Sequence, residues 1–217
     1  MPPANYRITR ITAPAATLVL VTLDQAKAVL GIDPSDTSKD PALTAQIDAV
    51  SLAIDNYCDR TFARQSYRDQ YRYVCNWLGL GEPLVTRQWP IAPDIDGVPV
   101  VAVTEDGAAL DVSLWEVEVE SGSVYRLDST ATVMVSSWTG SLILVDYDAG
   151  YDEIPADVQN AALEWLGARW YALGRDPTLR TEAIPDVITH TYYSDTTAPA
   201  MPSGVREWLA PYKRWFV

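Results

Sequence analysis

The chain has 217 residues, enough for one domain with a sizeable core or for a core with a long arm, and its 48% hydrophobic and 21% charged residues are a globular composition. Its 29 acidic and 16 basic residues give a formal net charge of −13. This charge argues against tight nucleic-acid binding, which needs Lys and Arg to displace counterions from phosphates, but not against DNA sliding past a repelling surface.

The sequence contains little that indicates a membrane-spanning segment or a metal site. No apolar run approaches the roughly 18 residues that span a bilayer, and no secretory signal is recognisable, so we expect a soluble protein, made in a cytoplasm, with no membrane partner. Cys58, Cys75 and His190 are too few for a structural zinc site, which usually has four Cys or His ligands. We expect buried thiols, and leave open whether the two cysteines pair.

The first predicted helix covers residues 22–31. Residues 1–16 contain three prolines and no clear period, so we expect an extended or loose strap there. In the following stretch, Thr22 and Gln25 have the spacing of a capping box, and Gly31 is a typical helix stop. A polar linker of turn-forming residues follows.

The strongest helical pattern covers residues 41–60. Its apolar residues recur at steps of four and three, as on an amphipathic helix: Leu43, Ile47, Val50, Ile54 and Tyr57. A second stripe of mostly small residues lies beside the first: Ala45, Ala49, Leu52 and Ala53. We interpret this second stripe as a face for close packing between subunits. The alternative is one broad stripe that faces the core.

Residues 62–147 read as antiparallel strands. Their β-branched and aromatic residues alternate with polar ones in several segments, which is typical of half-buried strands. Glu105–Gly107 and Ser121–Gly122 are hairpin-type turn signals. We therefore expect a β-rich insertion at about 65–147 between helical segments.

Residues 155–217 predict a helix, an arm and a tail. Pro155 begins a helix over 155–173, apolar on much of its circumference, and residues 175–201 form an arm with one predicted strand at Val187–Tyr193. A short helix starts at Ser203. The tail beyond it is aromatic and basic, a composition typical of interface anchors. The alternative is that the tail folds back to complete its own core.

Catalytic patterns are scarce. The sequence contains no P-loop, no G-x-G-x-x-G after a strand, no G-x-S-x-G and no H-E-x-x-H. Two of the three residues Glu116, Glu118 and Glu120 could be imagined as a glycosidase pair, but their two-residue spacing favours one solvated strand face. The segment 146–157 lacks the order of a calcium loop. We expect no enzyme, no metal and no cofactor.

Three segments, in order, resemble the head–tail connector (adaptor, or head-completion) proteins of long-tailed bacteriophages and gene transfer agents. LVTLDQAKAVLGID followed by ALTAQIDAVSLAIDNYCDRTF resembles the opening helical half of that family. VDYDAGYDEIPADVQNAALEWLGARWY looks like its Y-x-A-G-Y strand leading into the last long helix, and MPSGVREWLAPYKR is similar to its closing segment. The extra RWFV at the end and the acidic 105–120 region depart from the family pattern.

The resemblance implies a structural protein that forms a twelve-fold ring beneath the portal of a phage or phage-like particle. Such a ring extends the DNA channel and provides the platform for the next tail-side ring, such as a stopper or tail terminator, while DNA passes without specific binding. The location implied is the head–tail junction of a virion, with assembly in the bacterial cytoplasm. In this family the C-terminal segment engages the portal, which by carry-over predicts contacts at Val205, Trp208, Leu209, Tyr212 and Trp215.

The predicted fold class is α+β. It comprises a small helical bundle (helices near 22–31, 41–60 and 155–173), an inserted antiparallel β-strand region, and an extended C-terminal arm ending in a short helix. We divide it into a connector core, 1–174, and an arm with a portal-contacting tail, 175–217. The main alternative is a carbohydrate-binding or carbohydrate-cleaving β-rich protein, because eight tryptophans, twelve tyrosines and many acids suit sugar stacking. A tail terminator is a third reading, disfavoured by the helix content.

Overall fold

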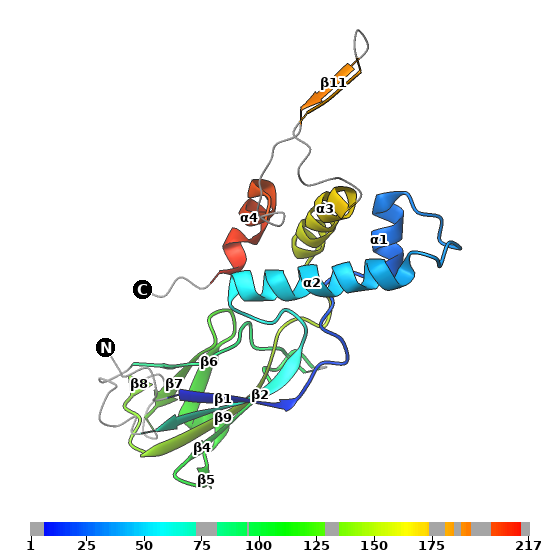
Figure 1. Ribbon diagram of the computed structural model, residues 1–217. Coiled ribbons are helices and arrows are strands. Elements are labelled where there is room, and N and C mark those ends of the chain that lie inside the picture. Colours follow the sequence, from blue (N-terminus) through cyan, green and yellow to red (C-terminus); the bar gives the residue numbers. More distant parts are fainter. Residues whose placement is uncertain are drawn as a thin grey trace. The chain divides into compact units, whose positions relative to one another are not determined.

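The computed structural model describes residues 7–72, 82–94, 96–128, 135–173, 181–184, 188–191 and 201–213. The chain divides into two compact units (Figure 1). A β-rich unit comprises Met1–Thr17 and Arg60–Glu153, and a helical unit comprises Leu18–Asp59 and Ile154–Val217. The helical unit is thus assembled from two separate stretches of sequence, with most of the β-rich unit inserted between them.

The helical unit contains α1 (Leu23–Leu30), α2 (Asp40–Cys58), α3 (Ala156–Leu173) and α4 (Ser203–Leu209), the last continued by a 3-10 turn at Ala210–Tyr212. The predicted capping box is confirmed: Gln25 N–H donates to Thr22 Oγ1 at 3.2 Å, and Thr22 N–H donates to Gln25 Oε1 at 2.8 Å. Gly31 ends α1 in the left-handed region at φ 66°. The helix predicted over 41–60 begins one residue earlier, at Asp40, and ends at Cys58.

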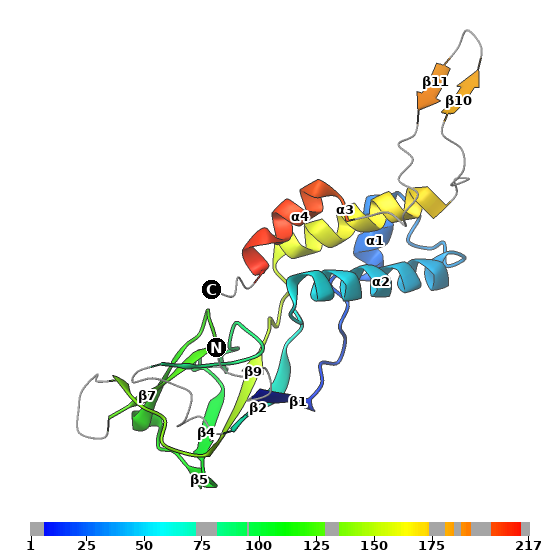
Figure 2. The same cartoon turned by 60° about the vertical axis from the view of Figure 1, so that its left-hand side comes forward.

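The helical unit packs around α3, and the face of α2 that the sequence predicted to be apolar is buried in it. α2 and α4 both lie against α3, and α1 contacts α2 and α3 (Figure 2). The buried residues of α2 are Leu43, Ile47, Val50, Ser51, Ile54 and Cys58. Tyr57, predicted inward, is half-buried, and Cys58, one residue on, takes its place in the core.

The β-rich unit contains two antiparallel sheets. The first has the order β1 (Arg7–Ala13), β2 (Gln65–Arg72), β9 (Leu142–Ala149), β4 (Val101–Glu105), β5 (Ala108–Ala109). The second has β3 (Leu84–Val85), β7 (Ser123–Leu127) and β6 (Trp115–Glu118), with β8 (Val135–Ser136) also paired to β7. Within the extended or loose strap expected over residues 1–16, residues 7–13 are extended and form the edge strand β1, whose pairing with β2 the sequence did not predict.

The strands β2 and β9 lie side by side in the middle of the five-stranded sheet. Buried and more exposed residues alternate along both, as the sequence pattern predicted. Tyr67, Tyr71 and Tyr147 fill the interior around the buried carboxylate of Asp69, whose Oδ2 accepts bonds from Arg87 N–H at 2.7 Å and Tyr147 Oη at 3.1 Å. Burial raises the pKa of the Tyr147 phenol, and the negative charge of Asp69 raises it further.

Residues in the predicted arm form a two-stranded antiparallel sheet, β10 (Thr181–Ile184) with β11 (Ile188–Thr191). The predicted strand at Val187–Tyr193 overlaps β11, while residues 187, 192 and 193 lie outside the described part of the chain. The short helix expected after Ser203 is α4, and its contacts with α3 make it part of the helical unit.

Candidate functional site

The outward side of α2 carries apolar residues that are exposed or half-buried, beside the exposed Asn56. At 100° per residue, Ala45, Ala49, Leu52 and Ala53 lie on the side opposite the core residues. Ala45 is exposed, Ala49 and Ala53 are half-buried, and Leu52 is 62% exposed. This arrangement differs from the single core-facing stripe that the sequence left open. The predicted subunit-packing residues instead form an apolar surface that is partly exposed to solvent.

A hollow of about 300 Å³ adjoins this surface. One wall is the extended segment before α1, held in place because Leu20 N–H donates to the buried Ser51 Oγ at 3.0 Å. The hollow, here called the α2 groove, is lined by Leu18, Val19, Asp48, Ser51, Leu52 and Asp55. Leu18 is 50% exposed, so two leucines offer apolar area and two aspartates border it. The sequence pattern did not predict the contribution of residues 18 and 19, because it depends on where the chain lies beside the helix.

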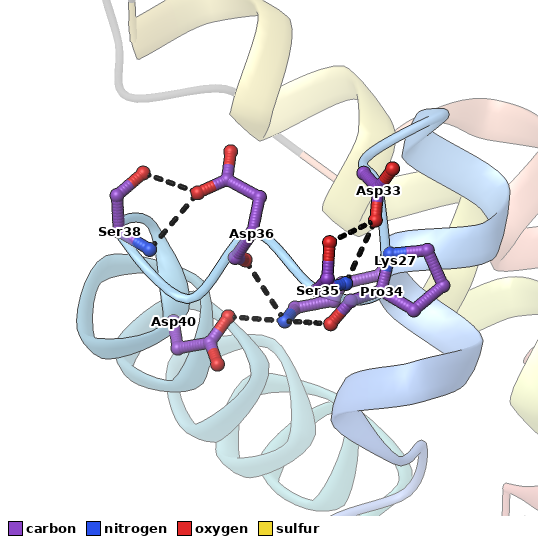
Figure 3. Close-up of polar contacts among 7 residues, drawn as sticks. All are labelled: Lys27, Asp33, Pro34, Ser35, Asp36, Ser38 and Asp40. Atoms are coloured by element: carbon purple, nitrogen blue, oxygen red, sulfur yellow. Dashed lines mark hydrogen bonds and ion pairs between the residues drawn. The ribbon is translucent and has the colours of Figure 1, made fainter.

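The loop between α1 and α2 is organised around a buried ammonium group (Figure 3). Lys27, only 3% exposed, donates from Nζ to the carbonyls of Pro34 at 3.2 Å and Asp36 at 3.0 Å, and forms an ion pair with Asp40 Oδ1 at 2.6 Å. These contacts join α1 to the start of α2. Sequence reasoning missed Lys27, although its position four residues after Leu23 places both on one helix face.

Two aspartates of the same loop bind serines that follow them. Asp33 Oδ1 accepts from Ser35 Oγ at 2.6 Å, and Asp36 Oδ1 accepts from Ser38 Oγ (Figure 3). The serine hydroxyl and backbone N–H bonds stabilise the charged carboxylates and lower the pKa of both aspartates. The loop therefore remains negatively charged at neutral pH.

The C-terminal segment is seated on its own helical unit. Val205 and Leu209 are fully buried, and Tyr212 Oη lies 2.7 Å from Asp157 Oδ1 and 2.8 Å from Oδ2, to which it donates. Trp208 is 48% exposed. Of the five predicted portal contacts, the structure thus places two in the core, as the self-completing alternative expected, and one at the surface. Tyr212 is half-buried, and Trp215 lies outside the described residues.

A cation–π contact fixes the end of this segment. Lys213 Nζ lies 3.8 Å from the ring centroid of Tyr57, near the C-terminus of α2. Together with Tyr212, it directs the chain past this end of α2.

The acids considered for chemistry have structural roles or face solvent. Glu116 and Glu118 are exposed on one face of β6, and Glu118 accepts from Ser121 Oγ at 2.5 Å. In the segment 146–157, Asp146 pairs with Arg68 at 2.6 Å and Asp148 with Arg64 at 3.0 Å. Across the described ranges, no group of three or more Cys, His, Asp or Glu side chains is placed to hold a metal ion. In the same part of the chain, no helix is long and apolar enough to cross a membrane.

Comparison with known proteins points to one family. Residues 20–77, which include α1, α2 and β2, match the family model of the phage gp6-like head-tail connector protein. No curated protein shows a significant match. Similar solved structures include a chain from the neck of an empty GTA particle, computed with C6 symmetry. The two chains are 16% identical, the match covers 97% of each of them, and the TM-score is 0.57.

Two further chains show the same likeness. One comes from the virion of a native gene transfer agent (GTA) particle, with 18% identity over 95% of this chain and 97% of that chain and a TM-score of 0.54. The other comes from the neck of a native GTA particle computed with C12 symmetry, with 17% identity over 97% of each chain and a TM-score of 0.53. At identities of 16%, 18% and 17%, the similarity to these three chains shows the fold alone. The predicted α+β class and the resemblance to head–tail connectors are confirmed.

Proposed function

We propose that this protein is a structural head–tail connector, and not an enzyme, that forms a ring under the portal of a phage or phage-like particle. The observation that carries the proposal is the match of residues 20–77 to the head-tail connector family, because this stretch contains α2 and its partly exposed apolar face. The similar solved chains come from GTA necks computed with C6 and C12 symmetry, which supports a ring and favours twelve copies.

In this proposal α2 makes the contact between copies. A solvent-facing side with Ala45, Ala49, Leu52 and Ala53 exposes apolar area that association would remove from water. Small side chains also let a neighbouring backbone approach closely. The subunit-packing role predicted for these four residues is therefore retained as a proposal.

The charge of the protein suits a channel that DNA traverses. A net charge of −13 repels phosphate, so DNA passes through the lumen without specific binding. The aspartates of the loop around Lys27 keep their charge at neutral pH and contribute to this repulsion. The ring would sit at the head–tail junction of the virion, assembled in the bacterial cytoplasm, with a stopper or tail terminator as its tail-side neighbour.

We propose that the C-terminal segment contacts the portal through its exposed side. Val205, Leu209 and Tyr212 hold the segment on the helical unit, while the half-exposed Trp208 offers the aromatic area typical of an interface anchor. Trp215 belongs to the same predicted set and lies outside the described residues.

The test is assembly with the portal protein of the same particle, followed by electron microscopy. We expect a ring on the portal with the full-length chain, and at least a tenfold loss of portal affinity for Trp208→Ala, which leaves the buried anchors in place. Tyr171→Ala is the matched control, because Tyr171 is a 66% exposed aromatic residue of α3. Binding of glycans instead of the portal, or no ring with any portal preparation, would overturn the proposal in favour of the carbohydrate-binding alternative.

A further inference from the structure

The α2 groove has the chemistry of a site for a cationic aromatic segment. Leu18 and Leu52 are 50% and 62% exposed, which leaves apolar area open to water. Asp48 and Asp55 border the hollow, and the described residues that line it include no Lys or Arg. A ligand with aromatic side chains would fill the hollow, and an adjacent positive charge would complement the exposed carboxylate of Asp48.

The chain itself contains a segment of this composition. Arg214-Trp215-Phe216-Val217 follows directly after Lys213, so two aromatic residues stand beside two positive charges in a protein of net charge −13. These four residues lie beyond the last described residue. They also lie at the point where the sequence departs from the family pattern, and only Trp215 among them belongs to the portal contacts that the resemblance implies.

The position of Lys213 favours the groove of another copy. Lys213 Nζ lies over Tyr57, and Tyr57 is five residues from Leu52, or about 140° around α2. The path between these faces along a helix of about 11 Å diameter is about 13 Å. Trp215, two residues beyond Lys213, adds only about 7 Å of chain.

We propose that Arg214–Val217 of one copy occupies the α2 groove of the next copy, with Trp215 and Phe216 against Leu18 and Leu52 and Arg214 near Asp48. The groove and the departing segment lie on different sides of α2, as a head-to-tail contact requires if repeated copies are to close into a ring. This inference rests on the proposed ring, and it moves Trp215 from the portal contact to the contact between subunits.

The test is cysteine cross-linking between two full-length chains assembled on the portal. One chain carries Ala49→Cys beside the groove and the other Val217→Cys at the end of the segment. We expect a cross-linked pair containing one chain of each kind, and about a tenfold lower yield when the second chain also carries Trp215→Ala. Ala109→Cys, at an exposed alanine of β5 in the other unit, replaces Ala49→Cys in the matched control and should give only background.

Each outcome decides between the two proposals. Rings on the portal with no cross-link above the Ala109→Cys control would overturn the groove contact and leave the connector proposal standing. A link formed only within a single chain carrying both Ala49→Cys and Val217→Cys would show that the segment fills its own groove, and would also overturn it. Loss of rings in the unmodified chain would reject the connector itself. Trp208→Ala, which should weaken the portal contact, should leave the cross-link between subunits unchanged on rings that do form.

Discussion

The outer faces of the two units differ in how they satisfy their surface groups. On the sheet, Arg68 and Asp146 stand directly opposite each other on β2 and β9 and pair at 2.6 Å, so this face is polar and largely self-satisfied. On α2, the outward face has Ala45, Ala49 and Leu52. Their side chains have no polar group to satisfy, and exposing their apolar area to water is unfavourable in free energy. The comparison separates a face adapted to solvent from one suited to another protein surface.

In the interiors of the two units the contrast is reversed, because it is now the β-rich unit that contains the unusual groups. The β-rich unit buries polar groups: Asp69 is fully buried among tyrosines, and the Arg60 guanidinium lies 4.9 Å from the ring centroid of Phe62 and 4.8 Å from that of Trp89. The helical unit buries mainly aliphatic side chains and one ammonium group, that of Lys27. Substitutions at polar core positions should therefore cost stability, whereas substitutions on the α2 face should cost assembly.

The largest expected loss of stability follows Asp69→Ala. The substitution removes the acceptor for Arg87 N–H and for the Tyr147 hydroxyl inside the sheet, so we expect the free energy of unfolding of the β-rich unit to fall by about 3 kcal/mol. Urea unfolding followed by near-ultraviolet circular dichroism measures this loss. Asp146→Ala, on the outer face of the same sheet, should cost about 1 kcal/mol or less. Equal losses for the two variants would contradict the contrast between interior and surface.

A smaller loss is expected for Lys27→Met. Methionine retains the apolar stem but removes the ammonium, which leaves the carbonyls of Pro34 and Asp36 and the carboxylate of Asp40 without this donor. Because Asp40 is 24% exposed, water compensates in part, and we expect a loss of about 2 kcal/mol from the helical unit. Far-ultraviolet circular dichroism during urea unfolding measures it, with the exposed Lys39→Met as control. A Lys27→Met protein as stable as that control would show that the buried ammonium does not organise the loop.

The smallest effect on stability is expected for Leu52→Asp. This substitution should also separate folding from assembly most clearly. Leu52 is 62% exposed, so its replacement should change the free energy of unfolding by less than about 0.5 kcal/mol while it abolishes rings on the portal. Leu173→Asp is the control, because Leu173 is equally exposed at the end of α3 and should leave the rings intact. If the Leu52→Asp protein formed normal rings, the α2 face would not be the contact between subunits.

Local sequence patterns predicted the elements whose causes are local. The Thr22–Gln25 capping box, the apolar period of α2 and the alternation along β2 and β9 each depend on residues close in sequence, and each is confirmed. The hairpin signals were also correct, because Asp106 at φ 47° and Gly107 at φ 88° form the turn between β4 and β5. The resemblance to head–tail connectors came from the same segments and their order.

Tertiary structure decided which of these surfaces stay open. The sequence marked Ala45, Ala49, Leu52 and Ala53 as a second stripe and the C-terminal segment as an aromatic anchor, but could not distinguish inward from outward packing for either. Exposure depends on which distant segments cover a face: residues 18–21 lie beside α2 without covering Leu52, whereas α3 covers Val205 and Leu209. The same reason explains β1 and Lys27, because a strand needs a partner and a buried ammonium needs its carbonyls, and folding brings both from elsewhere in the chain.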